Sequence, residues 1–184
     1  MREIKNFYIL NDLLERAENS PANRASACAA VFSRVRREIW LFGDCQAYTD
    51  RPHTNNKEID YVTASVRSLF IQSEIACGKS EDEILAIDSG RLFITPLLIK
   101  QSLFQNNLIS DKFSYGAFDG FPIPKKFLKV IKVASQINKI ALATDGYPQI
   151  LSTLEDSERE LKKAIEADPL CIGKNMGTKC IKKG

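Results

Sequence analysis

The sequence predicts an α+β fold, an αββα sandwich in which two antiparallel sheets are flanked by helices. Short strand-like segments come first, followed by two or three helical segments, further strands and a final helix. Strands and helices do not alternate one for one, which disfavours a doubly wound parallel sheet. No repeat or linker divides the chain, so we expect one domain over 1–184, with an N-terminal helix in 1–24 and a loose tail in 169–184.

The first third of the chain predicts a helix and then a β-hairpin. Apolar residues recur at helical spacing over 3–17. The small residues of 25–33 and the apolar run of 38–42 then form two strands, joined by a solvated turn at the arginines between them. A third strand is expected at 46–49, followed by a polar loop over 50–56.

The middle of the chain is predicted to be helical. Residues 62–77 place apolar side chains on one face, in steps of three and four, and Gly78 ends the helix. A capping box at 80–83 begins a second helix. Thr95 and Pro96 are typical of a helix start, with proline in the first turn, and predict a third helix from that point.

The last third is expected to complete the sheets and add a final helix. Strands are predicted at 113–118, 129–133 and 139–144. A capping box at 152–155 begins a helix that ends before Asp168 and Pro169.

Length, composition and charge limit the classes of protein to which this chain can belong. The chain has 184 residues, 44% of them hydrophobic, with a net charge of +3, as expected for a globular domain. We find no secretion segment and no run long enough to cross a bilayer, and therefore expect a cytoplasmic protein without membrane contact. The basic residues are not interleaved with aromatics on one face, which disfavours nucleic-acid binding.

Cysteine and histidine give little support for a zinc site. The chain has five cysteines with no CxxC spacing and a single histidine, His53, in a polar loop. We interpret Cys28 and Cys77 as small buried hydrophobic residues and His53 as a solvated surface residue.

Two apolar runs each end in an aspartate beside a glycine. The run 39–42 leads to Gly43 and Asp44, and the run 140–144 leads to Asp145 and Gly146. A carboxylate at the end of a buried strand lies where ligands and metals commonly bind. The simpler interpretation, in which each side chain only bonds the amides of its own turn, stays open. The functional interpretation requires the two carboxylates to face a common cleft.

These segments resemble the metal-dependent protein phosphatases of type 2C. The stretch from Ser26 through the hairpin to Gly43-Asp44-Cys45-Gln46-Ala47-Tyr48 is similar to the family's hairpin, whose return strand ends in Gly-Asp-Ser-Arg-Ala-Tyr. The stretch 140–146 is similar to the family's Leu-Ala-Thr/Ser-Asp-Gly signature. The resemblance covers roughly residues 25–50 and 115–165.

The resemblance implies a hydrolase that cleaves phosphoserine and phosphothreonine with Mg²⁺ or Mn²⁺, acting on a phosphoprotein or a small phosphoester. Asp145 matches a metal-binding position of the family, and Asp44 matches an acidic position near the metals. The family's N-terminal Asp-Gly strand and C-terminal Asp-Asp/Asn motif have no counterpart in this sequence. We therefore expect an incomplete metal site and leave catalytic activity open.

Two other functions fit the same sandwich. In N-terminal-nucleophile hydrolases, a Cys, Ser or Thr that is exposed by processing attacks an amide, and cleavage before Ser26 or Cys28 would create such a terminus. No Lys-Asp or Arg-Asp group is recognisable beside these residues from the sequence. The third function is a non-catalytic binding domain that forms a homodimer through an unpaired sheet edge.

Overall fold

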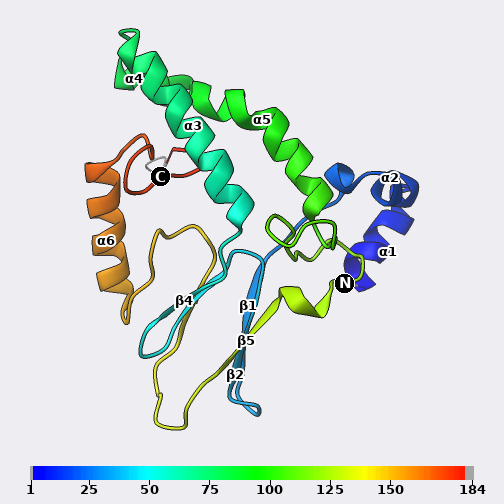
Figure 1. The fold of residues 1–184 in the computed structure, drawn as a ribbon. Helices are drawn as coiled ribbons and strands as arrows, with labels where there is room; N and C mark the ends of the chain where they lie inside the picture. Colours follow the sequence, from blue (N-terminus) through cyan, green and yellow to red (C-terminus); the bar gives the residue numbers. More distant parts are fainter. Residues whose placement is uncertain (1, 181–184) are drawn as a thin grey trace.

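The structure is a computed structural model that describes residues 2–180, and it confirms the predicted α+β class (Figure 1). One antiparallel sheet has the order β1-β2-β5, and the other has the order β4-β3-β6. The strands of the first sheet are β1 (Ala29–Ser33), β2 (Glu38–Phe42) and β5 (Leu128–Lys132). Those of the second are β3 (Gln46–Tyr48), β4 (Pro52–Thr54) and β6 (Ala141–Ala143).

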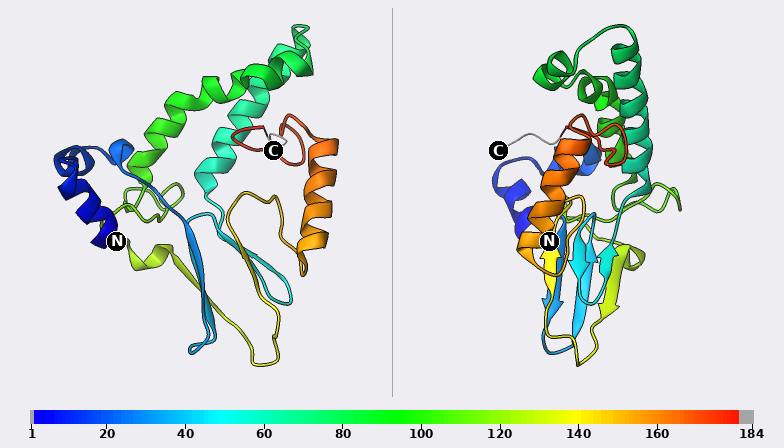
Figure 2. Two further views of the ribbon diagram at one scale, coloured as in Figure 1. Left: turned by 180° about the vertical axis from the view of Figure 1, so that it is seen from behind. Right: turned by 90° about the vertical axis from the view of Figure 1, so that its left-hand side faces the viewer.

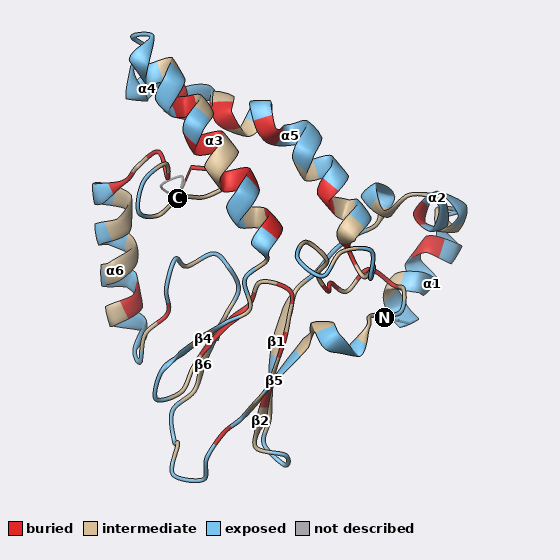
Figure 3. Ribbon diagram, viewed as in Figure 1, coloured by how far each residue is buried: buried red, intermediate tan, exposed pale blue. Residues whose placement is uncertain are grey.

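The main hydrophobic core brings the two sheets together. Ile39 and Leu41 of β2 and Ala47 of β3 are fully buried in one apolar cluster, which also contains Val133. Alternate residues of β2 are buried, because successive side chains of a strand point to opposite faces. Buried positions accordingly run along the strands in Figure 3. The predicted hairpin is confirmed, with Ser33 paired to Glu38 across the arginine turn.

The helices lie around and beyond the sheets (Figure 1). The N-terminal helices are on one side of the molecule and α6 is on the other, while α3, α4 and α5 stand at one end of the strands. The helices are α1 (Arg2–Leu10), α2 (Leu14–Asn19), α3 (Glu58–Ala76), α4 (Glu81–Ile87), α5 (Ser89–Gln101) and α6 (Leu154–Ala167), with short 3₁₀ turns at Pro21–Asn23, Ser102–Phe104 and Lys125–Phe127.

Helices α3 and α5 pack closely against each other (Figure 2). Gly90 permits this approach, because a Cβ at that position would lie 2.7 Å from Ile71 and 2.9 Å from Arg67. Phe70 and Phe93 stack farther along the pair, with ring centroids 4.2 Å apart. The two helices therefore pack as a pair at one end of the strands.

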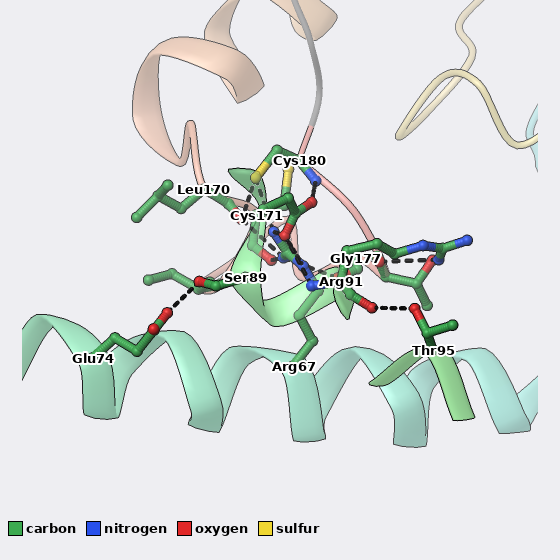
Figure 4. A network of polar contacts seen from close by, with 12 residues as sticks. Arg67, Glu74, Ser89, Arg91, Thr95, Leu170, Cys171, Gly177 and Cys180 are labelled. Carbon is green, nitrogen blue, oxygen red and sulfur yellow. Dashed lines mark hydrogen bonds and ion pairs between the residues drawn. The ribbon is translucent and has the colours of Figure 1, made fainter. Parts of the chain in front are cut away.

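The loop after α6, from Asp168 to Cys180, is packed against α3 rather than loose. Arg67 of α3 is fully buried and donates hydrogen bonds to the carbonyls of Leu170, Cys171 and Gly177 in this loop (Figure 4). Leu170 is itself buried. The expected loose tail over 169–184 is thus wrong for residues 169–180, and its last residues, 181–184, lie outside the described part of the chain.

Three other sequence expectations are corrected. The third helix begins at Ser89, not at Thr95, because the side chain of Asp88 caps it by accepting from the Arg91 amide, and Pro96 lies inside the helix. Residues 113–118 form no strand, and their backbone pairs only at isolated bridges. Cys77 is exposed at the end of α3.

Smaller differences concern element boundaries. The first predicted helix is interrupted between α1 and α2, where Asp12 has a positive φ of 55°. The loop over 50–56 contains the short strand β4. The last helix is capped by Thr153, which accepts from the amide of Asp156. No helix within residues 2–180 is both long and apolar enough to cross a membrane.

Candidate functional site

A cavity of about 610 Å³ opens between the helices α3 and α5, the turn after β6 and the loop after α6. Asp44 and Asp145 both line it, so the structure places the two sequence-predicted residues on one cavity. Residues of α3 and α5 form one side, including Asp60 and Arg91. Gly177 and neighbouring loop residues, which Arg67 anchors, form another side.

Asp44 follows β2 and uses both carboxylate oxygens within the protein. Its Oδ1 accepts a hydrogen bond of 2.8 Å from the Cys28 thiol, and its Oδ2 is 2.8 Å from Nζ of Lys57. Burial alone would raise the pKa of Asp44, but the bonds from Cys28 and Lys57 outweigh it and lower the pKa. Asp44 is therefore a carboxylate that is already bonded on both oxygens.

Lys57 joins two carboxylates beneath an aromatic ring. Its Nζ lies 2.8 Å from Asp44 and 3.2 Å from Asp60, and 4.8 Å from the centroid of the Tyr115 ring. Burial alone would lower the pKa of Lys57, but the two carboxylates outweigh it and raise the pKa above its usual range. Lys57 thus carries a fixed positive charge beside the Cys28–Asp44 pair.

Cys28 reaches Asp44 because of the hairpin register. Ala29 pairs with Phe42, so the residue before β1 lies beside Gly43 and Asp44. Burial is the main cause that raises the pKa of the Cys28 thiol to about 12, and the hydrogen bond to Asp44 adds to it. In the intact chain the group is therefore a neutral thiol whose proton points at a carboxylate.

Gly43 leaves the space that the thiol occupies. Its backbone has a φ of +67°, and a Cβ there would lie 2.3 Å from Sγ of Cys28. The side chain of Asn55 donates to the Gly43 carbonyl at 2.6 Å, which fixes the turn from outside. Only glycine fits this position without displacing the thiol.

The carbonyl immediately before Cys28 is also held. Ala27 forms an isolated antiparallel bridge with Phe118. The Phe118 amide donates to the Ala27 carbonyl at 2.8 Å, and the Ala27 amide donates back to Phe118 at 3.0 Å. The peptide bond between Ala27 and Cys28 is thus fixed in place, with a donor on its oxygen and a thiol on the following residue.

Asp145 has a different environment. It is exposed in the turn after β6, and none of the ion pairs found within residues 2–180 involves it. Across that described range no group of three or more His, Cys, Asp or Glu side chains is placed to hold a metal ion. The two aspartates predicted from the motifs therefore line one cavity but differ chemically. Asp44 is bonded on both oxygens, whereas Asp145 is exposed and takes part in none of the ion pairs of residues 2–180.

Sequence reasoning missed Lys57 and the Phe118 amide. Lys57 directly precedes α3, and nothing in its local sequence indicates its partners. The Cys28–Asp44 contact was detectable, because a hairpin with a turn at 34–37 brings residue 28 opposite residue 43. No family model, curated protein or solved structure matches this chain.

Proposed function

We propose that the protein is a self-processing amidohydrolase whose nucleophile is Cys28, exposed as an N-terminal residue by cleavage of its bond to Ala27. The observation that carries the proposal is the cluster of Cys28, Asp44 and Lys57 next to a peptide carbonyl that already accepts an amide hydrogen bond. A nucleophile beside a group that can accept its proton is the arrangement that covalent amide cleavage uses.

The first step is cleavage of the chain itself. Sγ of Cys28 attacks the carbonyl carbon of Ala27 while Asp44 accepts the thiol proton. The Phe118 amide, which is 2.8 Å from the Ala27 oxygen, stabilises the negative charge that develops there. The carbon–nitrogen bond breaks, the proton passes to the leaving nitrogen, and a thioester joins Ala27 to Cys28.

Water completes the cleavage. It adds to the thioester carbonyl, the carbon–sulfur bond breaks, and the sulfur regains a proton. The products are a carboxylate on Ala27 and a free α-amine and thiol on Cys28. No oxidant or other co-reactant is consumed apart from one water molecule.

The new α-amine then serves the reaction with substrate. It lies on the same residue as the thiol, and α-amines in general have a pKa of about 8. In this scheme it takes the thiol proton when Cys28 attacks a substrate amide. An acyl thioester forms, an amine leaves, and water releases the acid. We place the substrate in the cavity beside Asp44, because Asp44 and Lys57, which lie next to the nucleophile, both line it.

Lys57 has an electrostatic role in this scheme. The carboxylate of Asp44 beside the thiol opposes formation of a thiolate, because like charges repel. The positive charge of Lys57 between Asp44 and Asp60 offsets this repulsion.

Phosphoester hydrolysis is the second candidate function, favoured by the placement of Asp44 and Asp145 on one cavity. The residues fit a two-metal centre poorly. Both oxygens of Asp44 are bonded within the protein, and one of them faces the cation of Lys57, whose charge disfavours a neighbouring Mg²⁺ or Mn²⁺. Asp44 is therefore poorly suited to hold either metal ion.

An activity comparison tests the proposal. Incubated protein is assayed against a panel of short acyl and peptide amides of 7-amino-4-methylcoumarin, with chelator present, and against p-nitrophenyl phosphate with Mn²⁺. We expect amide hydrolysis that is independent of metal and absent in Cys28→Ala. Turnover of the phosphoester that requires Mn²⁺ and survives Cys28→Ala would contradict the proposal.

A further inference from the structure

Asp119, which follows the donor Phe118, is a fully buried carboxylate. Its Oδ2 accepts from the side chain of Gln105 at 3.0 Å, and its Oδ1 accepts from the amide of Phe121 at 3.0 Å. These two donors are neutral and belong to the part of the chain that follows Cys28. A buried carboxylate also needs a cation, because the desolvated charge is otherwise strongly unfavourable.

The cation comes from the segment that precedes the cleaved bond. Nη1 of Arg24 lies 3.2 Å from Oδ2 of Asp119, and within residues 2–180 this is the one ion pair found for Asp119. The Arg24 guanidinium also stacks over the Phe121 ring, 4.0 Å from its centroid. Arg24 is fixed from its other side by donating to the Ala17 carbonyl at 2.7 Å.

A second contact comes from α1. Tyr8 is buried, and its hydroxyl donates to the backbone carbonyl of Asp119 at 3.0 Å while accepting from the amide of Ala25 at 2.8 Å. Its ring lies 6.2 Å from that of Phe121. The hydroxyl of Tyr8 thus links the segment before the cleaved bond to the backbone beside the oxyanion donor.

The surface around Gly120, against which α1 packs, lets the residues of α1 come close to its backbone. Gly120 has a φ of +91°, and a Cβ there would lie 3.1 Å from the Tyr8 ring and 3.2 Å from both Ile4 and the backbone nitrogen of Lys5. The receiving surface, Asp119 to Phe121 with Gln105, is therefore filled by residues of the segment 2–27.

Resting on the self-cleavage proposed above, we infer that residues 1–27 stay bound after the cut as a second subunit of the mature protein. Departure of this segment would remove the cation that pairs with Asp119, together with the hydroxyl that holds its backbone. Asp119 directly follows Phe118, so the same contacts position the amide that stabilises the oxyanion. Arg24 and Tyr8 thus hold Asp119, and with it the neighbouring Phe118 amide, in place.

The experiment compares the cleaved protein under denaturing and native conditions. After cleavage, denaturing mass spectrometry resolves fragments 1–27 and 28–184. We expect size-exclusion chromatography and native mass spectrometry of the same sample to show both fragments in one species at equal amounts. Cleavage followed by elution of 28–184 alone would overturn this inference and leave the proposed function standing, whereas absence of cleavage would overturn both.

Matched variants identify the contact responsible. Arg24→Met should weaken retention of the short fragment on the order of 100-fold, measured as its dissociation on dilution, because it leaves a buried carboxylate unpaired. Arg16→Met removes an exposed arginine of the same segment and should change nothing. If Arg24→Met fails to cleave, Tyr8→Phe, which removes only the hydroxyl, is used in its place and should raise dissociation at least several-fold. If the cleaved test variant, Arg24→Met or its replacement Tyr8→Phe, retains the short fragment as well as Arg16→Met does, the inference is overturned.

Discussion

The thiol of Cys28 donates a 2.8 Å hydrogen bond to the carboxylate of Asp44, across a hairpin that separates them by sixteen positions. Lys57 holds the other oxygen of that carboxylate. Cys28 directly follows Ala27, whose carbonyl is held by the Phe118 amide. The Cys28–Asp44 pair therefore lies next to an amide bond of the chain itself.

The Cys28–Asp44 pair should control the rate of self-cleavage. Asp44→Asn removes the proton acceptor while keeping the shape of the side chain, and we expect the cleavage rate to fall on the order of 10²–10⁴-fold. Asp50→Asn, on an exposed carboxylate outside the cavity, is the control. Rates are read from denaturing gels over time, and equal rates for both variants would show that Asp44 has no part in proton transfer.

Gly43 should be essential for a steric reason. In Gly43→Ala the new Cβ would meet Sγ of Cys28 at 2.3 Å, so we expect little or no cleavage and a lower melting temperature. Gly78→Ala separates this clash from backbone strain, because Gly78 also has a positive φ of 94° but nothing within 4 Å of a Cβ. Gly78→Ala should be destabilised by about 1 kcal/mol and should still cleave. Loss of cleavage in both variants would point to folding rather than to the thiol.

Cleavage should change the reactivity of one cysteine. In the intact chain, burial and Asp44 raise the pKa of Cys28 to about 12, so iodoacetamide at pH 8 should modify the exposed Cys77 and leave Cys28 untouched. After cleavage the neighbouring α-amine takes the proton, and Cys28 should then react. Peptide mapping of both forms measures this change, and rapid labelling of Cys28 in the intact chain would contradict it.

The buried Arg67 should dominate the stability of the C-terminal loop. Its Nη2 lies 2.9 Å from Asp88 and from Sγ of Cys180, in addition to the carbonyl contacts that Figure 4 shows. Arg67→Met should reduce the free energy of unfolding by about 3–5 kcal/mol, because it leaves Asp88 unpaired. Arg34→Met, in the hairpin turn, should stay within about 0.5 kcal/mol of the original protein. Urea denaturation provides both values.

The ion pair between Arg67 and Asp88 predicts that the free energy of unfolding depends on pH. Burial alone would raise the pKa of Asp88, but the Cys180 amide and Arg67 outweigh it and lower the pKa in the folded state. The stabilisation is therefore complete above the unfolded pKa of about 3.9 and is lost as pH falls through the folded value. The difference in stability between the original protein and Arg67→Met should narrow in acid. A constant difference down to pH 2 would contradict this assignment.

Local patterns in the sequence predicted the hairpin and the long helix well. Residues 38–42 alternate about a buried face, and the arginine turn fixes their register with β1. The capping box at Ser80 and Glu83 was also confirmed. These features depend on residues close together in the chain, which is the information that a sequence pattern contains.

The expectations that proved wrong concern features that are held by contacts between residues far apart in the sequence. The loop after α6 has few apolar residues, and it is ordered by Arg67, more than a hundred positions earlier. Thr95 and Pro96 indicated a helix start, but the helix is capped at Asp88, about two turns earlier. The metal ligands expected at Asp44 and Asp145 stay a prediction. The ion pair between Lys57 and Asp44 could not be predicted, because no pattern in the sequence around Lys57 indicates it.

The most direct test of the central claim is the N-terminal sequence of the large fragment after purified protein is incubated at neutral pH. The account predicts a fragment that begins Cys-Ala-Ala-Val, with a mass equal to residues 28–184, and its complete absence in Cys28→Ala. An original protein that stays intact, or a cut at the same bond in Cys28→Ala, would contradict the claim that Cys28 attacks the carbonyl of Ala27.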